Sequence, residues 1–263
     1  MMKKNLRLTA ILFFWLLLWQ TAAMAIRNPI LLVAPADVLA SLLGWLKTSG
    51  FWQTLLFSFS RILTGFFCAA AAGTLLGTAA VSVPVIREFL APLMLLAKSV
   101  PVASFVILAL IWAGAANLSI FISFLVSLPL FYTATRTGLQ SADRKLLELC
   151  HVFRVSRLKR IRTVYLPALL PHLLSSADSA LGLAVKSGVA AEVIGVPDHS
   201  IGEQLYMAKI YLSTADLFAW TFIIILSAWL LEHLLHRFLG AFIPASVSAR
   251  PADDPARKKE DTP

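Results

Sequence analysis

Apolar residues gather in six long stretches along the chain, separated by short polar segments. The stretches are residues 8–26, 55–83, 89–113, 118–135, 167–196 and 217–238. A bilayer span needs about 20 mainly apolar residues, because lipid offers no hydrogen-bond partner for backbone groups. The pattern therefore predicts an all-α, polytopic membrane protein with about six transmembrane helices.

Two segments outside these stretches have different patterns. Residues 35–50 begin with Pro35 and Asp37 and carry apolar residues at helical spacing, which predicts a short amphipathic helix on the membrane surface. The last residues, 241–263, are polar, contain proline and mix both charge signs, which is typical of a disordered tail. We therefore expect one transmembrane domain over residues 1–240, followed by this tail.

The composition agrees with a membrane protein. Of 263 residues, 59% are hydrophobic and 14% are charged, whereas a soluble domain is about 45–50% apolar and about a quarter charged. This excludes a disordered protein and an ordinary cytosolic enzyme. Cys68 and Cys150 are the only cysteines, which excludes a disulfide scaffold.

The net charge of +9 is compatible with a nucleic-acid partner. The positions of the basic residues along the chain indicate a different explanation. Eight of the basic residues lie in one loop: Arg136, Arg144, Lys145, Arg154, Arg157, Lys159, Arg160 and Arg162. Further basic residues lie near the two ends of the chain: Lys3, Lys4 and Arg7 near the first, and Arg237, Arg250, Arg257, Lys258 and Lys259 near the last. Because cytoplasmic loops are rich in Lys and Arg, both termini and this loop are predicted to be cytoplasmic. The charge is a topology signal, and no nucleic-acid partner is expected.

The first apolar stretch also has features of a signal peptide, because basic residues precede it and Ala22-Ala23-Met24-Ala25 near its end resembles a small-residue cleavage site. Its apolar run of roughly 18 residues is longer than the usual 7–15 of a signal core. We expect an uncleaved first helix; cleavage would leave five spans.

The basic loop has its own helical pattern. Between residues 143 and 167 apolar residues recur at helical spacing with charges between them, which predicts two short helices with a bend near residues 154–156. On periodicity alone, a basic juxtamembrane helix held by anionic lipid explains the segment equally well.

The segment resembles the cytoplasmic loop of ABC-importer permeases. Their motif runs E-A-A, three residues, Gly, nine residues, Ile, one residue, Leu-Pro. Glu148 takes the first position, Leu166-Pro167 take the last, and Val164 replaces the Ile.

The motif also has departures in this chain. Leu149 and Cys150 stand for the two alanines, and Arg154 stands for the glycine. Glycine at that position permits the bend between two short helices, because it accepts backbone angles that other residues resist.

Shorter pieces from about residue 35 to 239 are similar to the nitrate/sulfonate/taurine branch of these permeases. They include Trp52-Gln53, Ser60-Arg61, Gly65-Phe66, KSVPVASF at 98–105, Ile111-Trp112, Ala190-Ala191-Glu192, Ile201-Gly202, and Thr214 with Asp216.

The resemblance implies a type I importer subunit of a bacterial inner membrane, which pairs with a second permease copy. A cytoplasmic ABC ATPase would dock on the coupling-helix loop at about 143–165, and an external binding protein would deliver a small anion such as a sulfonate, taurine or nitrate. The residues implied in coupling are Glu148, Phe153, Arg154, Ser156, Arg157, Leu166 and Pro167.

The sequence has no G-x-x-x-x-G-K-[ST] phosphate loop. We therefore expect a transport subunit that is not itself an enzyme, with ATP and Mg bound by the partner ATPase. We expect no catalytic residue, metal site or cofactor in this chain; membrane lipid is its remaining partner.

Three charged residues, Asp178, Lys186 and Glu192, fall in the fifth stretch. Charges there are costly and usually face a bundle interior or a water-filled path. One alternative is an internal Asp178–Lys186 pair, with Glu192 reaching the lipid interface. The other is that these residues line a pathway, together with Ser99 and Ser104.

A different class of protein also fits these three charges. A self-sufficient secondary transporter or channel would use them for ion coupling and would need no ATPase.

Gly73 and Gly77 form a pair of small residues four positions apart, which lets helices approach closely. Packing within one chain and a seam between two copies are both open for this pair.

Overall fold

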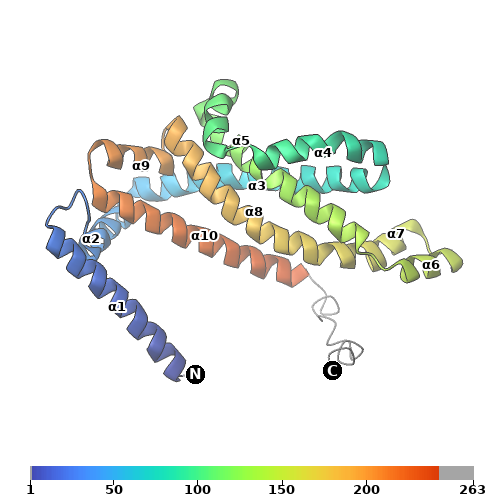
Figure 1. The fold of residues 1–263 in the computed structure, drawn as a ribbon, viewed down its shortest axis with the longest axis horizontal. Coiled ribbons are helices and arrows are strands. Elements are labelled where there is room, and N and C mark those ends of the chain that lie inside the picture. The colour runs from blue at the N-terminus through green and yellow to red at the C-terminus, as the bar shows by residue number, and fades with distance from the viewer. Residues whose placement is uncertain (1, 243–263) are drawn as a thin grey trace, which may run out of the picture. The chain divides into compact units, whose positions relative to one another are not determined.

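The computed structural model describes residues 2–242, which are helical with no strand among them. Figure 1 follows the helices in chain order. They are α1 (Met2–Ile26), α2 (Pro35–Leu46), α3 (Ser49–Ser82), α4 (Pro84–Ser99), α5 (Val102–Gln140), α6 (Arg144–Val152), α7 (Arg157–Arg160), the π-helical turn η1 (Ile161–Tyr165), α8 (Leu166–Gly195), α9 (Ile201–Ile210) and α10 (Thr214–Phe242). The tail predicted at 241–263 lies outside the described residues from position 243 onward.

Within residues 2–242, five helical segments are long and apolar enough to cross a membrane: Thr9–Ile26, Ser49–Ser82, Val102–Gln140, Arg157–Gly195 and Thr214–Arg237. The all-α, polytopic membrane class predicted from the sequence is confirmed. The count of six crossings stays a prediction.

The region of the third and fourth apolar stretches differs from the expected pattern. The stretch at 89–113 is divided between α4 and α5, which are separated at residues 100–101. α4 has 16 residues, or about 24 Å, which is shorter than the roughly 30 Å hydrocarbon core. The boundary expected after residue 113 is a kink inside α5, where Gly114 has φ 70° and ψ 164°.

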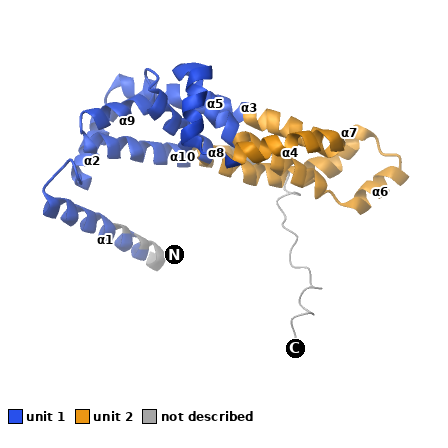
Figure 2. Cartoon of the chain, turned by 45° about the horizontal axis from the view of Figure 1, so that its top comes forward, with its two compact units in different colours: residues 1–68, 99–126, 183–229 blue, residues 69–98, 127–182, 230–263 orange. Residues whose placement is uncertain are grey.

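The chain forms two compact units, coloured separately in Figure 2. Of the described residues, unit 1 comprises 2–68, 99–126 and 183–229, and unit 2 comprises 69–98, 127–182 and 230–242. The long helices α3, α5, α8 and α10 each contribute a segment to both units.

Small residues bring the helices of unit 1 into close contact. A Cβ atom on Gly65 of α3 would overlap the backbone oxygen of Ile120 in α5. A Cβ on Gly188 of α8 would lie 2.7 Å from the side chain of Ile62 and 2.8 Å from Ser123 Oγ. Glycine is therefore needed at both positions for α3, α5 and α8 to pack at this distance.

In unit 2 the pair Gly73 and Gly77 has the same role. Cβ atoms at these positions would lie 2.7 Å from the Cβ atoms of Phe131 and Thr135 in α5. The alternative of close packing within one chain is confirmed for this pair.

The short helix expected at 35–50 is confirmed as α2, which begins with Pro35 at its first position. Val38 of this helix is buried with Val33 and Ala219, while Leu39 is 57% exposed. The Trp19 indole donates to the Val33 carbonyl at 3.0 Å. The amphipathic pattern therefore sets which side of α2 packs against α1 and α10.

Candidate functional site

The polar loop of unit 2 contains the two short helices predicted from the sequence. Asp143 begins the first of them, because its Oδ1 accepts a hydrogen bond from the Lys145 backbone at 2.8 Å. α6 follows and ends at Val152, and α7 begins at Arg157. The bend expected near residues 154–156 lies between them.

The geometry of this bend explains the glycine that the importer motif has at this position. Val155 N donates to the Cys150 carbonyl at 2.9 Å and Arg154 N donates to the His151 carbonyl at 3.1 Å. These two bonds form a Schellman motif, whose left-handed residue is usually glycine. That residue is Arg154, with φ 49°. The bend therefore forms without glycine, with Arg154 in a backbone conformation that side chains disfavour.

The loop exposes large apolar side chains. Val152 is 73% exposed, Phe153 is 75% exposed and Leu158 is 61% exposed. Among the other predicted coupling residues, Glu148, Ser156 and Arg157 are also exposed, Leu166 is 41% exposed and Pro167 is half-buried. Six of the seven predicted coupling residues thus lie on the surface of unit 2: Glu148, Phe153, Arg154, Ser156, Arg157 and Leu166.

The Leu-Pro end of the motif lies inside a continuous helical run from Arg157 to Gly195. Proline removes a backbone donor and clashes with the carbonyl four residues earlier. The π-helical turn Ile161–Tyr165 immediately precedes Leu166 and Pro167, and its wider winding relieves such a clash.

Glu192, one of the predicted pathway residues, is fully buried in unit 1. Its Oε2 accepts hydrogen bonds from Ser58 Oγ at 2.7 Å and from Gly202 N at 3.4 Å. Ser58 Oγ in turn accepts from Ile201 N at 2.8 Å. The alternative that Glu192 reaches the lipid interface is therefore wrong: its carboxylate joins α3 and α8 to the beginning of α9.

The beginning of α9 is further defined by its own sequence. Ser200 Oγ accepts from Glu203 N at 3.0 Å, and Glu203 Oε2 accepts from His199 N at 2.6 Å, an arrangement close to a capping box. A Cβ on Gly202 would overlap the backbone of Glu192. Sequence reasoning missed Ser58 and Gly202 as partners of Glu192, although the Ser-x-x-Glu pattern was a local signal for the helix start.

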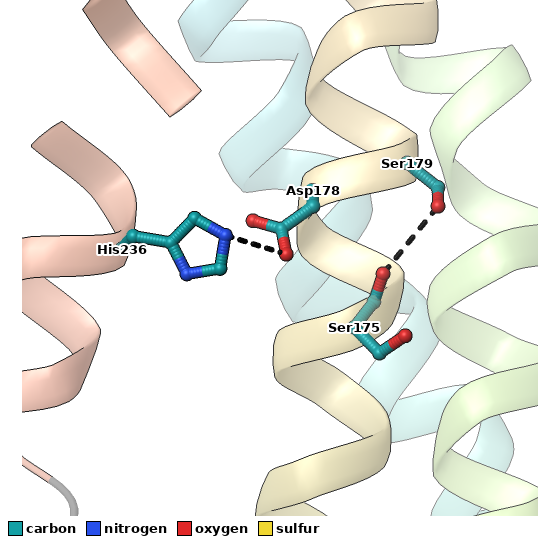
Figure 3. A network of polar contacts seen from close by, with 4 residues as sticks. All are labelled: Ser175, Asp178, Ser179 and His236. Carbon is teal, nitrogen blue, oxygen red and sulfur yellow. Dashed lines mark hydrogen bonds and ion pairs between the residues drawn. The ribbon is translucent and has the colours of Figure 1, made fainter. Parts of the chain in front are cut away.

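Asp178 pairs with a histidine in unit 2. Its Oδ2 lies 2.9 Å from Nε2 of His236 on α10, and Figure 3 shows the two side chains facing each other across α8 and α10. The partner considered from the sequence, Lys186, is an exposed side chain. The sequence of α8 alone could not identify His236, because this partner lies on a different helix.

The two serine candidates are exposed, at the end of α4 and the beginning of α5. Ser104 Oγ donates to the Pro101 carbonyl at 2.9 Å within its own helical turn. The pathway role of Ser99, Ser104, Asp178, Lys186 and Glu192 stays a prediction.

A second polar cluster in unit 1 was not singled out from the sequence. Asp216, in the first turn of α10, accepts hydrogen bonds from Ser41 Oγ at 2.5 Å, Trp45 Nε1 at 3.0 Å and Ser213 Oγ at 2.6 Å. This carboxylate fastens α2 to the beginning of α10. An acidic residue in the first helical turn was the available signal.

Across residues 2–242, no group of three or more His, Cys, Asp and Glu side chains could hold a metal ion.

The long apolar helices and the helical polar loop define the chain as a polytopic α-helical membrane protein.

Comparison with known proteins gives the family. The family described as "Binding-protein-dependent transport system inner membrane component" matches residues 61–246, and the chain belongs to it. It is thus a membrane permease of the ABC importers.

Curated relatives cover most of the chain. The taurine transport system permease protein TauC of Escherichia coli is 29% identical over 86% of this chain and 82% of its own length. The putative aliphatic sulfonates transport permease protein SsuC of Bacillus subtilis is 26% identical over 82% and 78%. The bicarbonate transport system permease protein CmpB of Synechococcus elongatus is 25% identical over 73% of each.

The fold is also found in a solved structure. An inward-facing structure of the MetNI methionine ABC transporter has a chain that matches with a TM-score of 0.58 and 17% identity, over 77% of this chain and 98% of that one. This likeness concerns the fold.

Proposed function

We propose that the chain is the membrane-spanning subunit of an ATP-driven importer and forms the translocation pathway for a small anion. An external binding protein delivers the solute, two permease copies pair in the membrane, and a separate ATPase binds ATP and Mg. Both chain termini and the loop carrying α6 and α7 lie in the cytoplasm.

The observation that carries this proposal is the apolar tip of a basic loop. Val152 and Phe153 are exposed on a loop that also carries the eight basic residues at 136–162. Exposed apolar side chains grouped within a polar surface mark a site where a partner binds. The bend at Arg154 sets the angle between α6 and α7, as a helix that inserts into a groove on another subunit requires. The proposed partner is the ATPase.

The solute class is inferred from the relatives. TauC, SsuC and CmpB are named for taurine, aliphatic sulfonates and bicarbonate, which are small and carry an anionic group. We propose a cargo of the same chemistry, of the sulfonate, taurine or nitrate kind. The charged residues of α8 remain the candidates to meet it, with Lys186 as the exposed cation.

The docking role is tested by Phe153→Ser, with Val85→Ser as a matched control. Val85 is 73% exposed, similar to Phe153 at 75%, but lies in the first turn of α4. Both variants are co-expressed with a candidate ABC ATPase from the same organism and purified by a tag on the permease. Phe153→Ser is expected to lower recovery of the ATPase at least tenfold, while Val85→Ser retains it. Equal recovery with both variants would remove the loop tip from the docking surface.

The alternative of a self-sufficient secondary transporter predicts a different outcome. It requires solute flux through the purified chain in liposomes under an ion gradient, without any ATPase. The proposed function predicts no such flux.

A further inference from the structure

A cavity of about 380 Å³ lies within unit 2. It is next to the beginning of the helical run Arg157–Gly195, which follows the bend at Arg154. Its walls come from the last turns of α3, from the end of α5, and from α7, η1 and the first turn of α8. No residue of α6 lines it. The cavity is therefore distinct from the exposed apolar tip at Val152 and Phe153.

The positive charge in this cavity has no counterpart in its walls. Arg157 and Arg160 line it, and none of its lining residues is acidic. The Nε of Arg160 is buried and has no hydrogen-bond partner among the described residues. A buried guanidinium donor without an acceptor is costly, and it is satisfied best by a carboxylate or phosphate.

The hydroxyl groups in the walls do not change this. Thr78 Oγ1 donates to the Thr74 carbonyl at 2.8 Å, and Ser82 Oγ donates to the Thr78 carbonyl at 3.0 Å. Both hydroxyl groups therefore donate their hydrogen bonds to carbonyls of α3 itself. The third wall hydroxyl belongs to Tyr165, and the two arginines are the charged donors among the lining residues.

The remaining walls are apolar and reach the surface. Val81 is 37% exposed, Ile161 is 50% exposed and Leu166 is 41% exposed, and all three line the cavity. A ligand that fits this site combines an anionic head with a hydrocarbon chain. A free inorganic anion would leave the apolar walls uncovered.

The position along the helices indicates where such a ligand comes from. α3 ends at Ser82, α5 ends at Gln140, and the next membrane-crossing run begins at Arg157. These three ends lie beside the basic loop, which the positive-inside rule assigns to the cytoplasm. Basic pockets between helices on that side bind lipid head groups, because the leaflet contains anionic lipid.

We propose that this cavity binds an anionic glycerophospholipid, with its phosphate on Arg157 and Arg160 and an acyl chain along Val81, Ile161 and Leu166. The lipid would hold the beginning of the helical run that follows the bend. This inference rests on the predicted topology and does not depend on which solute is transported.

The test compares two double variants that remove the same charge. Arg157→Gln with Arg160→Gln removes both cavity cations. Lys159→Gln with Arg162→Gln removes two exposed cations of the same segment that do not line the cavity. The full chain is purified in mild detergent and titrated with dioleoyl phosphatidylglycerol, dioleoyl phosphatidylcholine or inorganic phosphate. Bound lipid is counted by native mass spectrometry, and thermal unfolding is followed in parallel.

We expect the wild type and the Lys159/Arg162 variant to retain phosphatidylglycerol and to be stabilised by it. The Arg157/Arg160 variant should bind it at least tenfold more weakly, and phosphatidylcholine should give no shift in any of them. Equal loss in both double variants would show a general charge effect and overturn the proposal. Stabilisation by inorganic phosphate alone, equal to that by phosphatidylglycerol, would overturn it as well.

A second variant covers the case in which the arginine variant does not fold. Val81→Trp fills the cavity from its exposed edge and keeps both arginines. It should lose bound phosphatidylglycerol while retaining the elution volume of the wild type. Full retention of the lipid by folded Val81→Trp would place the lipid elsewhere and contradict the proposal.

Discussion

The sharpest prediction on the fold concerns Ser58, whose hydroxyl connects three helices in unit 1. It donates to Glu192 Oε2 at 2.7 Å and accepts from Ile201 N at 2.8 Å. Ser58→Ala removes both bonds at once. Of the three hydrogen bonds in this network, the 3.4 Å contact between Gly202 N and Glu192 Oε2 then remains.

The magnitude follows from the burial of these groups. Ser58 and Glu192 are each 0% exposed. A buried polar group left without its partner costs about 1–3 kcal/mol, and more when it is charged. Ile201 N loses its partner and Glu192 Oε2 keeps only its longer hydrogen bond, from Gly202 N. The attachment of α9 should therefore weaken by about 3 kcal/mol, which is on the order of a hundredfold in its opening equilibrium.

Hydrogen–deuterium exchange of peptides covering residues 199–210 measures this opening, because α9 amides exchange when the helix detaches. Ser60→Ala is the matched control, since Ser60 is exposed and its hydroxyl bonds only to the Phe57 carbonyl at 2.9 Å in its own helix. Ser58→Ala should speed exchange in α9 and Ser60→Ala should not. Unchanged protection in Ser58→Ala, or equal loss in both variants, would refute the reasoning.

Further predictions address the bend, the α9 contact and the histidine pair. Arg154→Gly should raise the stability of the purified protein by about 0.5–1 kcal/mol, because glycine adopts a positive φ without strain; a lower melting temperature would contradict this. Gly202→Ala should destabilise by about 3 kcal/mol or more, since the backbone of α8 fills that space, whereas Gly44→Ala, with no atom within 4 Å, should cost nothing; similar melting temperatures for the two would contradict the contact. Asp178→Asn should cost less than about 1 kcal/mol, because its partner His236 is 63% exposed, and a thermal-unfolding loss above about 2 kcal/mol would contradict the pair as drawn.

The sequence was sufficient where local physics decides the outcome. Long apolar runs define the membrane class, and the pattern after Pro35 defines α2. The bend near Arg154 was predictable from the helical spacing of the apolar residues in the loop, although the glycine of the importer motif is absent there. A favourable pair of backbone hydrogen bonds at the helix end compensates the strain at this residue.

The sequence was insufficient where long-range packing decides the outcome. The partner of Glu192 is Ser58, 134 positions away in the chain, and the partner of Asp178 is on α10. A helical wheel gives angles on one helix and contains no information on its neighbours. Hydropathy likewise could not show that α4 and α5 separate at residues 100–101, because both sides of the break are apolar. The local signal for this break is Pro101, because proline disfavours a continuing helix.

The central claim, that this permease works only as part of an ATP-driven importer, is tested most directly by transport in liposomes. The purified chain is reconstituted alone, with a candidate ABC ATPase, and with this ATPase plus a candidate binding protein, all from the same organism. Uptake of radiolabelled taurine, an alkanesulfonate and nitrate is then measured with and without ATP. We predict uptake of one of these anions only when the permease, ATPase, binding protein and ATP are all present. Uptake by the chain alone under an ion gradient, unaffected by ATP, would contradict the account.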